Sequence, residues 1–546
     1  MLQATNILFL SQKTLIITMD EFDYIIIGAG SAGCVLTNRL IKSGKYKVLL
    51  LEAGGKDNYP WIHIPVGYYK TMHNPKTDWC FKTEPDETME NVSIPYPRGK
   101  TLGGSSSING LLYIRGQERD YDIWRQLGNK GWSYEDVLPV FKRMESYDGG
   151  DDKYRGRSGP LRVTDPDESG LLYETIMSAA QQVGIPRNAD YNGENQEGIA
   201  MSQATISNGR RMSTAYCYLN PIKHRKNLNI LSDAQTSSLI LEGKKCTGVE
   251  FHHKNKTRQV NASREVVLCA GTINSPQLLE LSGIGCPELL KKVGITVKHE
   301  LRGVGENLRD HYAPRTRWLI GKQGVTYNDK ARGLGLLWQG FRFIFQQKGL
   351  MANPIAPMRA FVKTREGLEA PDALLGWVPL LYEPNYKLSK TSGVTCYAHA
   401  MRPESTGSIH INSKNTTDPP IIKFNFLSKE IDIDVTLKAI RIARSIMTAP
   451  VMEPLQITEA SPGPNKVSDA ELLDWAKEVG ETTYHPVGTC KMGADKMAVV
   501  DHKLRVHGID GLRVADASIM PTQVSGNTNA PSIMIGEKAA DLILAA

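Results

Sequence analysis

The chain has 546 residues, of which 41% are hydrophobic and 23% are charged, and its formal net charge is +7. This length exceeds one compact core, so we expect two domains or one large domain with an insertion. The basic residues are scattered and no run of 18 apolar residues occurs, which argues against nucleic-acid binding and against a transmembrane segment.

The first 18 residues carry two apolar patches, Ile7–Leu10 and Leu15–Ile17, separated by polar residues. They lack the charged start of a secretory signal. Met19 stands just before the first predicted strand and is a candidate initiator. We therefore expect residues 1–18 to be an N-terminal extension outside the fold.

A dinucleotide-binding turn follows the first predicted strand. The apolar run 22–27 is typical of a buried parallel strand, and a helix and a second strand at 47–51 come after the turn. Glycines permit the tight turn, the approach of a pyrophosphate and close helix–strand packing, while an acidic residue after the second strand accepts hydrogen bonds from a ribose. The helix N-terminus is expected to face the phosphates. The predicted binding residues are Gly28, Gly30, Ser31, Ala32, Gly33, Glu52 and Ala53.

A second glycine-rich segment, residues 98–110, would be costly as a helix or strand. As a loop it offers consecutive backbone N–H groups to phosphate or to polar atoms of a cofactor ring. Apolar residues at its end favour packing over a flexible linker. The binding residues predicted here are Arg98, Gly103, Gly104, Ser105, Asn109 and Gly110.

The middle of the chain gives weaker signals. Residues 266–271 indicate a strand that enters a turn, and 394–400 and 407–412 are expected to form strands of an antiparallel sheet. Residues 430–447 show the apolar spacing of a helix. Four apolar residues are expected to form a wall of a substrate site: Trp377, Val378, Leu380 and Leu381.

The C-terminal end offers a titratable base and a neutral hydrogen-bond donor. A base can take a proton from a weakly acidic group, and a neutral donor can hold the oxygen on which negative charge develops. His485, before Pro486, is the candidate base because imidazole titrates near neutral pH. Asn527 is the candidate neutral donor. A helix starting near Asn529 and running to Ile543 would point its positive end at the reduced cofactor.

Several motifs together resemble one family. Residues 98–116 and 271–285 resemble the first and second signatures of the glucose–methanol–choline (GMC) oxidoreductases, and 303–311 and 511–518 resemble further blocks. The resemblance covers residues 22–544 and implies bound FAD, with Asp516, Ala517, Asn527 and Thr528 near it. In the family the residues matching His485 and Asn527 face the reactive edge of the flavin. Ile108 occupies the position of the histidine that tethers FAD in some members, so we expect non-covalent FAD.

The resemblance also implies an α/β fold with a discontinuous, Rossmann-like FAD-binding domain and an α+β substrate domain that contains an antiparallel sheet. The expected FAD-binding pieces are residues 20–165, 205–312 and 480–546, the last of which carries the candidate catalytic residues. The substrate domain is expected at 313–479.

We expect a primary alcohol to be oxidised to an aldehyde, with hydride passing to flavin N5. In choline-oxidising relatives a glutamate precedes a phenylalanine by four residues; the matching residue here is Pro357, and Arg359 is close to it. A neutral alcohol is therefore favoured over choline, which stays an alternative. A photodecarboxylase and a binding protein without turnover are remoter alternatives, because the chain keeps both His485 and Asn527.

The electron acceptor is left open by the sequence. A dehydrogenase that passes electrons to a quinone or respiratory carrier is favoured, and an oxygen-using oxidase is the alternative. Eight cysteines lie far apart without zinc-ligand spacing, so we expect buried, reduced thiols and no metal. The expected location is the cytoplasm, with peripheral contact to the inner face of a membrane as an alternative.

Overall fold

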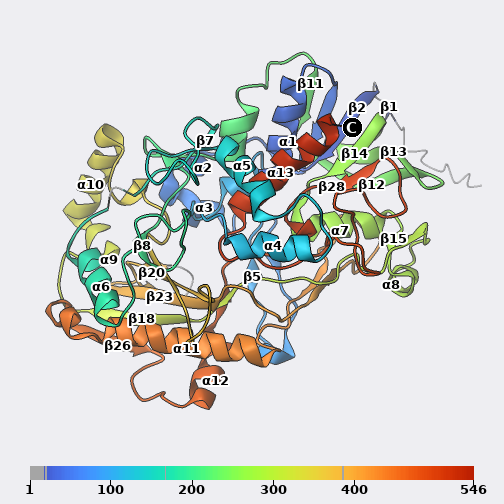
Figure 1. The fold of residues 1–546 in the computed structure, drawn as a ribbon. Helices are drawn as coiled ribbons and strands as arrows, with labels where there is room; N and C mark the ends of the chain where they lie inside the picture. The colour runs from blue at the N-terminus through green and yellow to red at the C-terminus, as the bar shows by residue number, and fades with distance from the viewer. Residues whose placement is uncertain (1–16, 19–20, 167, 384–386, 546) are drawn as a thin grey trace, which may run out of the picture.

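Two β-sheets organise the molecule, one toward the upper right of Figure 1 and one toward the lower left. A computed structural model describes residues 17–18, 21–166, 168–383 and 387–545. Most of the predicted extension lies outside the described residues. Residues 17–18 form strand β1 (Ile17–Thr18), which pairs in parallel with β14 (Lys256–Leu268).

The first sheet is parallel at its centre. Its strands run in the order β11 (Leu228–Leu231), β3 (Val48–Leu51), β2 (Phe22–Ile27) and β14, and β28 (Leu512–Val514) also pairs with β14. β3 is buried throughout and β2 almost throughout, as expected for a parallel sheet covered on both faces. The predicted strand at 22–27 is confirmed, and the one at 47–51 begins one residue later.

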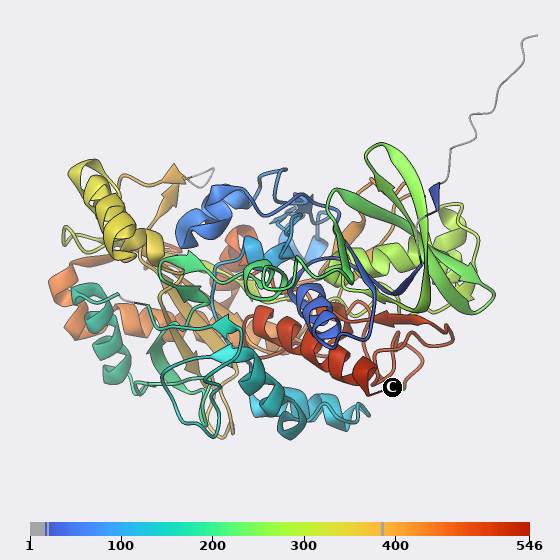
Figure 2. The same ribbon diagram turned by 90° about the horizontal axis from the view of Figure 1, so that it is seen from above.

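Helices from the two ends of the chain lie side by side against this sheet. Figures 1 and 2 both show α1 (Ser31–Lys42) beside α13 (Asn529–Leu544). Gly536 permits their close approach, because a Cβ there would lie 2.5 Å from the carbonyl oxygen of Ala32. Arg39 of α1 forms ion pairs with Glu537 and Asp541 of α13. The predicted C-terminal helix is confirmed.

The first half of β14 extends the sheet in the antiparallel sense. It pairs with β13 (Lys245–His253), which pairs with β12 (Ala234–Glu242). The second half of β14 pairs in parallel with β2 and β28. One 13-residue strand therefore joins the antiparallel hairpins to the parallel core.

The second sheet has six strands, and all its neighbours are antiparallel. Their order is β26 (Ile457–Ser461), β18 (Arg315–Ile320), β23 (Gly393–Ala400), β20 (Ala373–Val378), β19 (Met358–Val362) and β8 (Gly198–Met201). The edge strand β8 comes from the segment between the first two predicted FAD-binding pieces. Figure 1 shows α11 (Glu430–Met447) beneath this sheet and α6 (Leu171–Gln182) at its side. The predicted helix at 430–447 is confirmed.

Two expectations for this region need correction. Of the four residues expected to form the wall of a site, Val378 alone lines the cavity described below. Side chains alternate along β20, so Trp377 is buried against Met447 of α11, and Leu380 and Leu381 are buried outside the cavity lining. The strand expected at 407–412 is shortened to β24 (Ser408–His410). It pairs with β25 (Ile421–Lys423) in a separate two-stranded sheet.

The remaining helices are mostly short connections. They are α2 (Pro60–His63), α3 (Tyr68–Thr71), α4 (Glu118–Gln126), α5 (Tyr134–Met144), α7 (Gly271–Leu281), α8 (Pro287–Lys292), α9 (Tyr327–Lys330), α10 (Gly333–Phe341) and α12 (Asp469–Val479). Among the described residues, none of the helices is long and apolar enough to cross a bilayer.

The eight cysteines are free thiols, but they are not all buried as expected. Cys80 is exposed and Cys286 is half-buried; the first has φ +55°, and the second directly precedes the short helix α8. No group of three or more histidine, cysteine or acidic side chains in the described part of the chain is arranged to hold a metal.

Candidate active site

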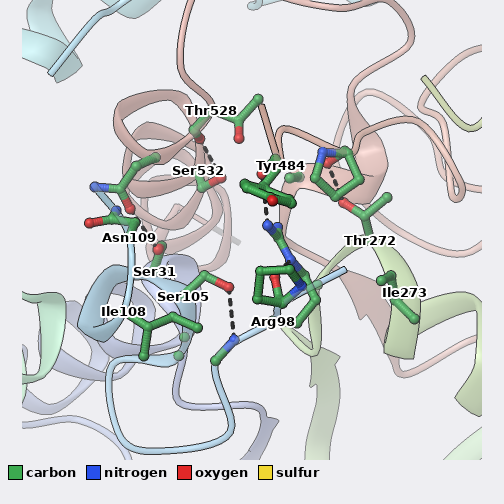
Figure 3. Close-up of a pocket in the computed structure, with 18 of the residues that line it drawn as sticks. Ser31, Arg98, Ser105, Ile108, Asn109, Thr272, Ile273, Tyr484, Thr528 and Ser532 are labelled. Atoms are coloured by element: carbon green, nitrogen blue, oxygen red, sulfur yellow. Dashed lines mark hydrogen bonds between the residues drawn. The ribbon is translucent and has the colours of Figure 1, made fainter. Parts of the chain in front are cut away.

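A cavity opens where the carboxyl ends of the parallel strands meet the inner face of the second sheet. Gly28 follows β2, Glu52 follows β3 and Cys269 follows β14, and all three line it. Its opposite wall includes Thr395, Tyr397 and His399 of β23. Ligands of open α/β sheets bind at this carboxyl edge. Figure 3 shows the residues of the cavity that surround Arg98 and Ser31.

The turn at 28–33 needs its glycines for close packing. A Cβ on Gly28 would lie 2.5 Å from the carbonyl oxygen of Cys269, and one on Gly33 would lie 1.9 Å from that of Gly28. Gly30 is less tightly packed, because the nearest atom to a Cβ there would be the carbonyl oxygen of Cys269 at 3.9 Å, and Gly30 lines the cavity. Helix α1 begins there without a side-chain cap or an acidic residue in its first turn. Its first N–H groups are therefore available to an anion.

The loop at 98–110 packs directly on this turn. The N–H of Gly103 donates to the carbonyl oxygen of Ala29 at 2.7 Å. A Cβ on Gly104 would lie 2.7 Å from the Cα of Gly30, so the two glycine loops touch backbone to backbone. Ser105 accepts the N–H of Gly99 at 3.2 Å, as Figure 3 shows. The loop is thereby fixed as one wall of the cavity.

Glu52 is buried at the dinucleotide end of the cavity. Its carboxylate accepts the N–H groups of Ala29 at 2.9 Å and Gly54 at 2.8 Å. Burial raises the pKa of Glu52 to about 7, and the two N–H groups oppose that rise. Each carboxylate oxygen keeps a second lone pair, which a ribose hydroxyl can use.

Three helix N-termini meet at this cavity. Besides α1, residues at the starts of α7 and α13 line it. The first turns of α1 and α13 have no side-chain cap, whereas the first turn of α7 is bonded by a carboxylate. Ser31 links α1 to α13 through a 2.8 Å hydrogen bond to Asn529. Asp516 accepts the Gly271 N–H at the start of α7, at 2.9 Å. The uncapped positive ends of α1 and α13 favour a ligand with negative charge.

Most predicted cofactor-binding residues are brought together here. Gly33 and Gly103 are not among the residues that line the cavity; they support its wall by close packing and by a backbone hydrogen bond. The others line it: Gly28, Gly30, Ser31, Ala32, Glu52, Ala53, Arg98, Gly104, Ser105, Asn109, Gly110, Asp516, Ala517, Asn527 and Thr528.

His485 and Asn527 meet at the far end of the cavity. The Asn527 Nδ2 lies 2.7 Å from the His485 Nε2. The backbone of His485 is fixed on both sides, since its N–H donates to Asp310 at 2.7 Å and its carbonyl oxygen accepts from Gln523 at 3.0 Å. Figure 3 shows Arg98 bonded to the carbonyl oxygen of Tyr484, just before the histidine.

A second histidine sets which nitrogen of His485 carries the proton. His311 Nε2 lies 2.8 Å from the carbonyl oxygen of Met401, so this nitrogen must be the donor. In neutral His311 the Nδ1 is then an acceptor, and it lies 3.0 Å from the His485 Nδ1. His485 therefore carries its proton on Nδ1, and its Nε2 presents a lone pair to Asn527 and the cavity.

Asn527 is oriented by a buried arginine. The Arg359 Nη1 donates to the Asn527 Oδ1 at 3.3 Å, which turns the amide Nδ2 toward His485. Arg359 is 0% exposed and also donates to Ser202 at 2.9 Å. The same side chain thus fixes the amide and places a positive charge beside the imidazole.

Comparison with known proteins agrees with this geometry. Residues 22–313 match the N-terminal sequence profile of the GMC oxidoreductases, and residues 403–536 match the C-terminal profile. The chain belongs to the GMC oxidoreductase family. It is 41% identical to an oxygen-dependent choline dehydrogenase of Vibrio vulnificus and 40% identical to an alcohol dehydrogenase (acceptor) of Pseudomonas putida; each match covers 96% of this chain, and 94% and 96% of those proteins.

Solved structures of this GMC oxidoreductase fold are similar over nearly the whole chain. Pyridoxine 4-oxidase from Mesorbium loti has a TM-score of 0.87 at 28% identity and covers 96% of this chain and 99% of its own. A formate oxidase variant from Aspergillus oryzae has a TM-score of 0.89 at 26% identity, with 96% and 98% covered. The enzyme is a flavoprotein that acts on CH–OH donors.

The cavity fits FAD. The uncapped N-termini of α1 and α13 and the glycine turn at the cavity wall suit a pyrophosphate, and Glu52 suits a ribose. Ile108 also lines the cavity, and its side chain has no atom able to form a covalent link. The residues present therefore match the expected non-covalent cofactor.

Replacing Gly104 with alanine should abolish FAD binding in this GMC oxidoreductase. The new Cβ would meet Gly30 at 2.7 Å, and the backbone has φ +52°. We expect purified Gly104→Ala to lack the visible absorbance of flavin while keeping its far-UV circular dichroism. Gly44→Ala is the matched control, because Gly44 has φ +72° but nothing within 4 Å of its Cβ. Equal flavin content in Gly104→Ala and Gly44→Ala would contradict the assignment of this cavity as the FAD site.

Activity of the GMC enzyme should survive acidification below the ordinary histidine pKa. Burial lowers the pKa of His485 well below 6.5, and the nearby His399, Arg98 and Arg359 lower it further. The imidazole is a base only when neutral, so kcat/KM should stay constant as pH falls through 6.5 and decline only at lower pH. Removing a positive neighbour by Arg359→Met should move the decline to higher pH. A reversible decline of the wild-type kcat/KM centred above pH 6.5 would contradict this expectation.

Sequence reasoning missed the groups that surround the imidazole. Thr483 lies 2.8 Å from the His485 Nδ1, and its position two residues earlier on an extended segment was the available signal. His311, the last residue of the block at 303–311, contacts His485 directly. His399 stacks on His311 with ring centroids 4.4 Å apart. These contacts join β23 to the C-terminal segment, and local sequence patterns do not encode such long-range contacts.

Proposed function

We propose that this enzyme oxidises a primary alcohol to an aldehyde, with His485 and Asn527 as its catalytic residues. His485 Nε2 takes the hydroxyl proton, and the Asn527 amide holds the oxygen as negative charge develops on it. When bound, FAD supplies N5 as the acceptor of the hydride that leaves the carbon. The observation that carries the proposal is the 2.7 Å contact between Nε2 and the amide Nδ2 at the cavity wall.

The charges around the cavity favour a neutral substrate. Two carboxylates line it, those of Glu52 and Asp516, and both bond backbone N–H groups near the dinucleotide end. Near His485 stand the cations of Arg98 and Arg359. The position of the choline-binding glutamate is Pro357 here. A trimethylammonium group would therefore meet no carboxylate, which favours an aliphatic or aromatic alcohol although several relatives are named choline dehydrogenases.

The electron acceptor belongs to the proposal as well. A dehydrogenase that uses a quinone or a respiratory carrier is supported by the alcohol dehydrogenase (acceptor) of Pseudomonas putida. Oxygen is the alternative, because similar solved structures include oxidases. We propose a cytoplasmic location, with peripheral contact to the inner face of a membrane as the alternative.

The test is anaerobic reduction of the bound flavin. Holoenzyme is mixed with neutral primary alcohols and, separately, with choline, and the visible absorbance is followed. Bleaching by the neutral alcohols at rates well above that with choline is the expected result. Readmitting air then separates oxidase from dehydrogenase. Faster bleaching by choline would overturn the substrate assignment, and no bleaching by any alcohol would overturn the reaction.

A further inference from the structure

Helix α10 turns its apolar side to solvent. The π-helix η5 (Arg342–Gln346) continues it, and large apolar residues recur along both at the spacing of one helix face. Six of them form what we call the apolar ridge: Leu334 (84% exposed), Leu337 (70%), Trp338 (56%), Phe341 (46%), Ile344 (69%) and Phe345 (72%). Figures 1 and 2 both show α10 projecting at the left-hand end of the molecule.

The helix is attached to the protein by its polar side. Gln339 is the buried residue of α10, and its Oε1 accepts the N–H of Leu350 at 3.0 Å. A surface helix of a soluble protein has the opposite arrangement, with its apolar stripe facing the core. Contiguous exposed apolar surface of this kind marks a site of interaction with another protein or with a membrane.

The charges beside the ridge identify the partner. Lys330, Arg332, Arg342 and Lys348 flank it along the chain, and no acidic residue occurs between Asp329 and Glu366. A carboxylate from elsewhere in the chain, that of Glu168, interacts with Lys330 and Arg342, but it is partly buried and bonded to Asn353. Arg332 is held in place by the carbonyl oxygens of Ser389 and Lys390. An anionic surface complements this pattern, whereas a second copy of the same face would bring like charges together.

We propose that the apolar ridge and its basic flanks dock on an anionic lipid bilayer. The ridge lies in the boundary between headgroups and acyl chains, and the basic side chains contact lipid phosphates. The helix does not span the bilayer, since α10 has nine residues. Binding is therefore peripheral and weakens as salt is added.

The docking surface is continuous with the substrate side of the cavity. Leu350, which follows η5, belongs to one apolar cluster with Val378, Ile355 and Tyr382. The last three also line the cavity. One packed apolar cluster thus lies between the apolar ridge and the substrate side of the cavity.

Vesicle binding tests the proposal. Holoenzyme is floated with vesicles of phosphatidylcholine alone and with vesicles that also contain phosphatidylglycerol. We expect binding to the anionic vesicles, at least about tenfold weaker to the neutral ones, and at least about tenfold weaker for Leu337→Glu/Trp338→Glu. Val467→Glu is the matched control, because Val467 is 64% exposed outside the ridge, and it should bind like wild type. No binding to anionic vesicles, or undiminished binding of the ridge variant, would overturn the proposal.

Fluorescence gives an independent readout of insertion. Lipids with a spin label on the acyl chain should quench Trp338, and Trp338→Phe should remove most of that quenching. If the wild type were dimeric and showed no quenching by lipid, and the ridge variant were monomeric, the ridge would be assigned to self-association instead.

Oxidation of a water-soluble alcohol with a soluble dye acceptor should be unchanged in Leu337→Glu/Trp338→Glu. That assay separates failure of docking from failure of the proposed reaction.

Discussion

Replacing His485 with alanine is expected to slow reduction of the flavin by alcohol by about 10²–10⁴-fold, the contribution of a positioned general base. The imidazole Nε2 is the proton acceptor at the cavity wall, and His311 keeps the proton on the other nitrogen. The measurement is anaerobic stopped-flow absorbance at saturating alcohol, with flavin content checked from the spectrum.

The control for this variant is His252→Ala, which changes an exposed histidine bonded to Thr257 far along the sheet. It should reduce its flavin at the wild-type rate. His311→Gln should give an intermediate loss and an altered pH profile, because the acceptor for the His485 Nδ1 proton is changed. Unchanged reduction rates in His485→Ala would assign proton removal to another group.

Replacing Asn527 with alanine should cost about 10²–10³-fold in the same assay, the usual loss for one oxyanion donor. Asn527→Asp is the more discriminating change. Its carboxylate would lie beside His485 and next to Arg359, so it would raise the imidazole pKa and repel developing negative charge. We expect Asn527→Asp to lose at least as much rate as the alanine variant and to shift the acid decline of kcat/KM to higher pH.

Asn529→Ala is the matched control for Asn527. Asn529 bonds Ser31 at the dinucleotide end, away from the imidazole. Its loss should weaken retention of FAD and leave the rate of the flavin-loaded fraction nearly unchanged. If both asparagine variants lost rate equally with full flavin content, the oxyanion role would not belong to Asn527 alone.

The sequence predicted the elements whose patterns are local. The strand at 22–27, the glycine turn, the helix at 430–447 and the C-terminal helix all follow from apolar spacing, glycines or caps within a short window. The family resemblance added the order of the motifs and the cofactor. Strand β8 escaped prediction because its place at the edge of the second sheet depends on pairing with β19, which comes about 160 residues later.

The candidate site was predictable in its reactive pair and unpredictable in its surroundings. His485 and Asn527 stand in recognisable segments, and the structure brings their side chains into contact. Arg359 was noted as a charge near the substrate, but its bond to Asn527 depends on the register of β19. Trp377 was misplaced because an apolar run does not tell which of its members faces a cavity.

The pairing of α1 with α13 has a consequence for how the enzyme is made. Ser31 contacts Asn529, and Ala32 lies against Gly536, so the turn that receives the cofactor is completed by residues about 500 positions later in the chain. A nascent chain emerging from the ribosome cannot build this contact until its last helix has been released. Cofactor loading should therefore be a post-translational event, and chains stalled before residue 529 should be degraded as empty protein.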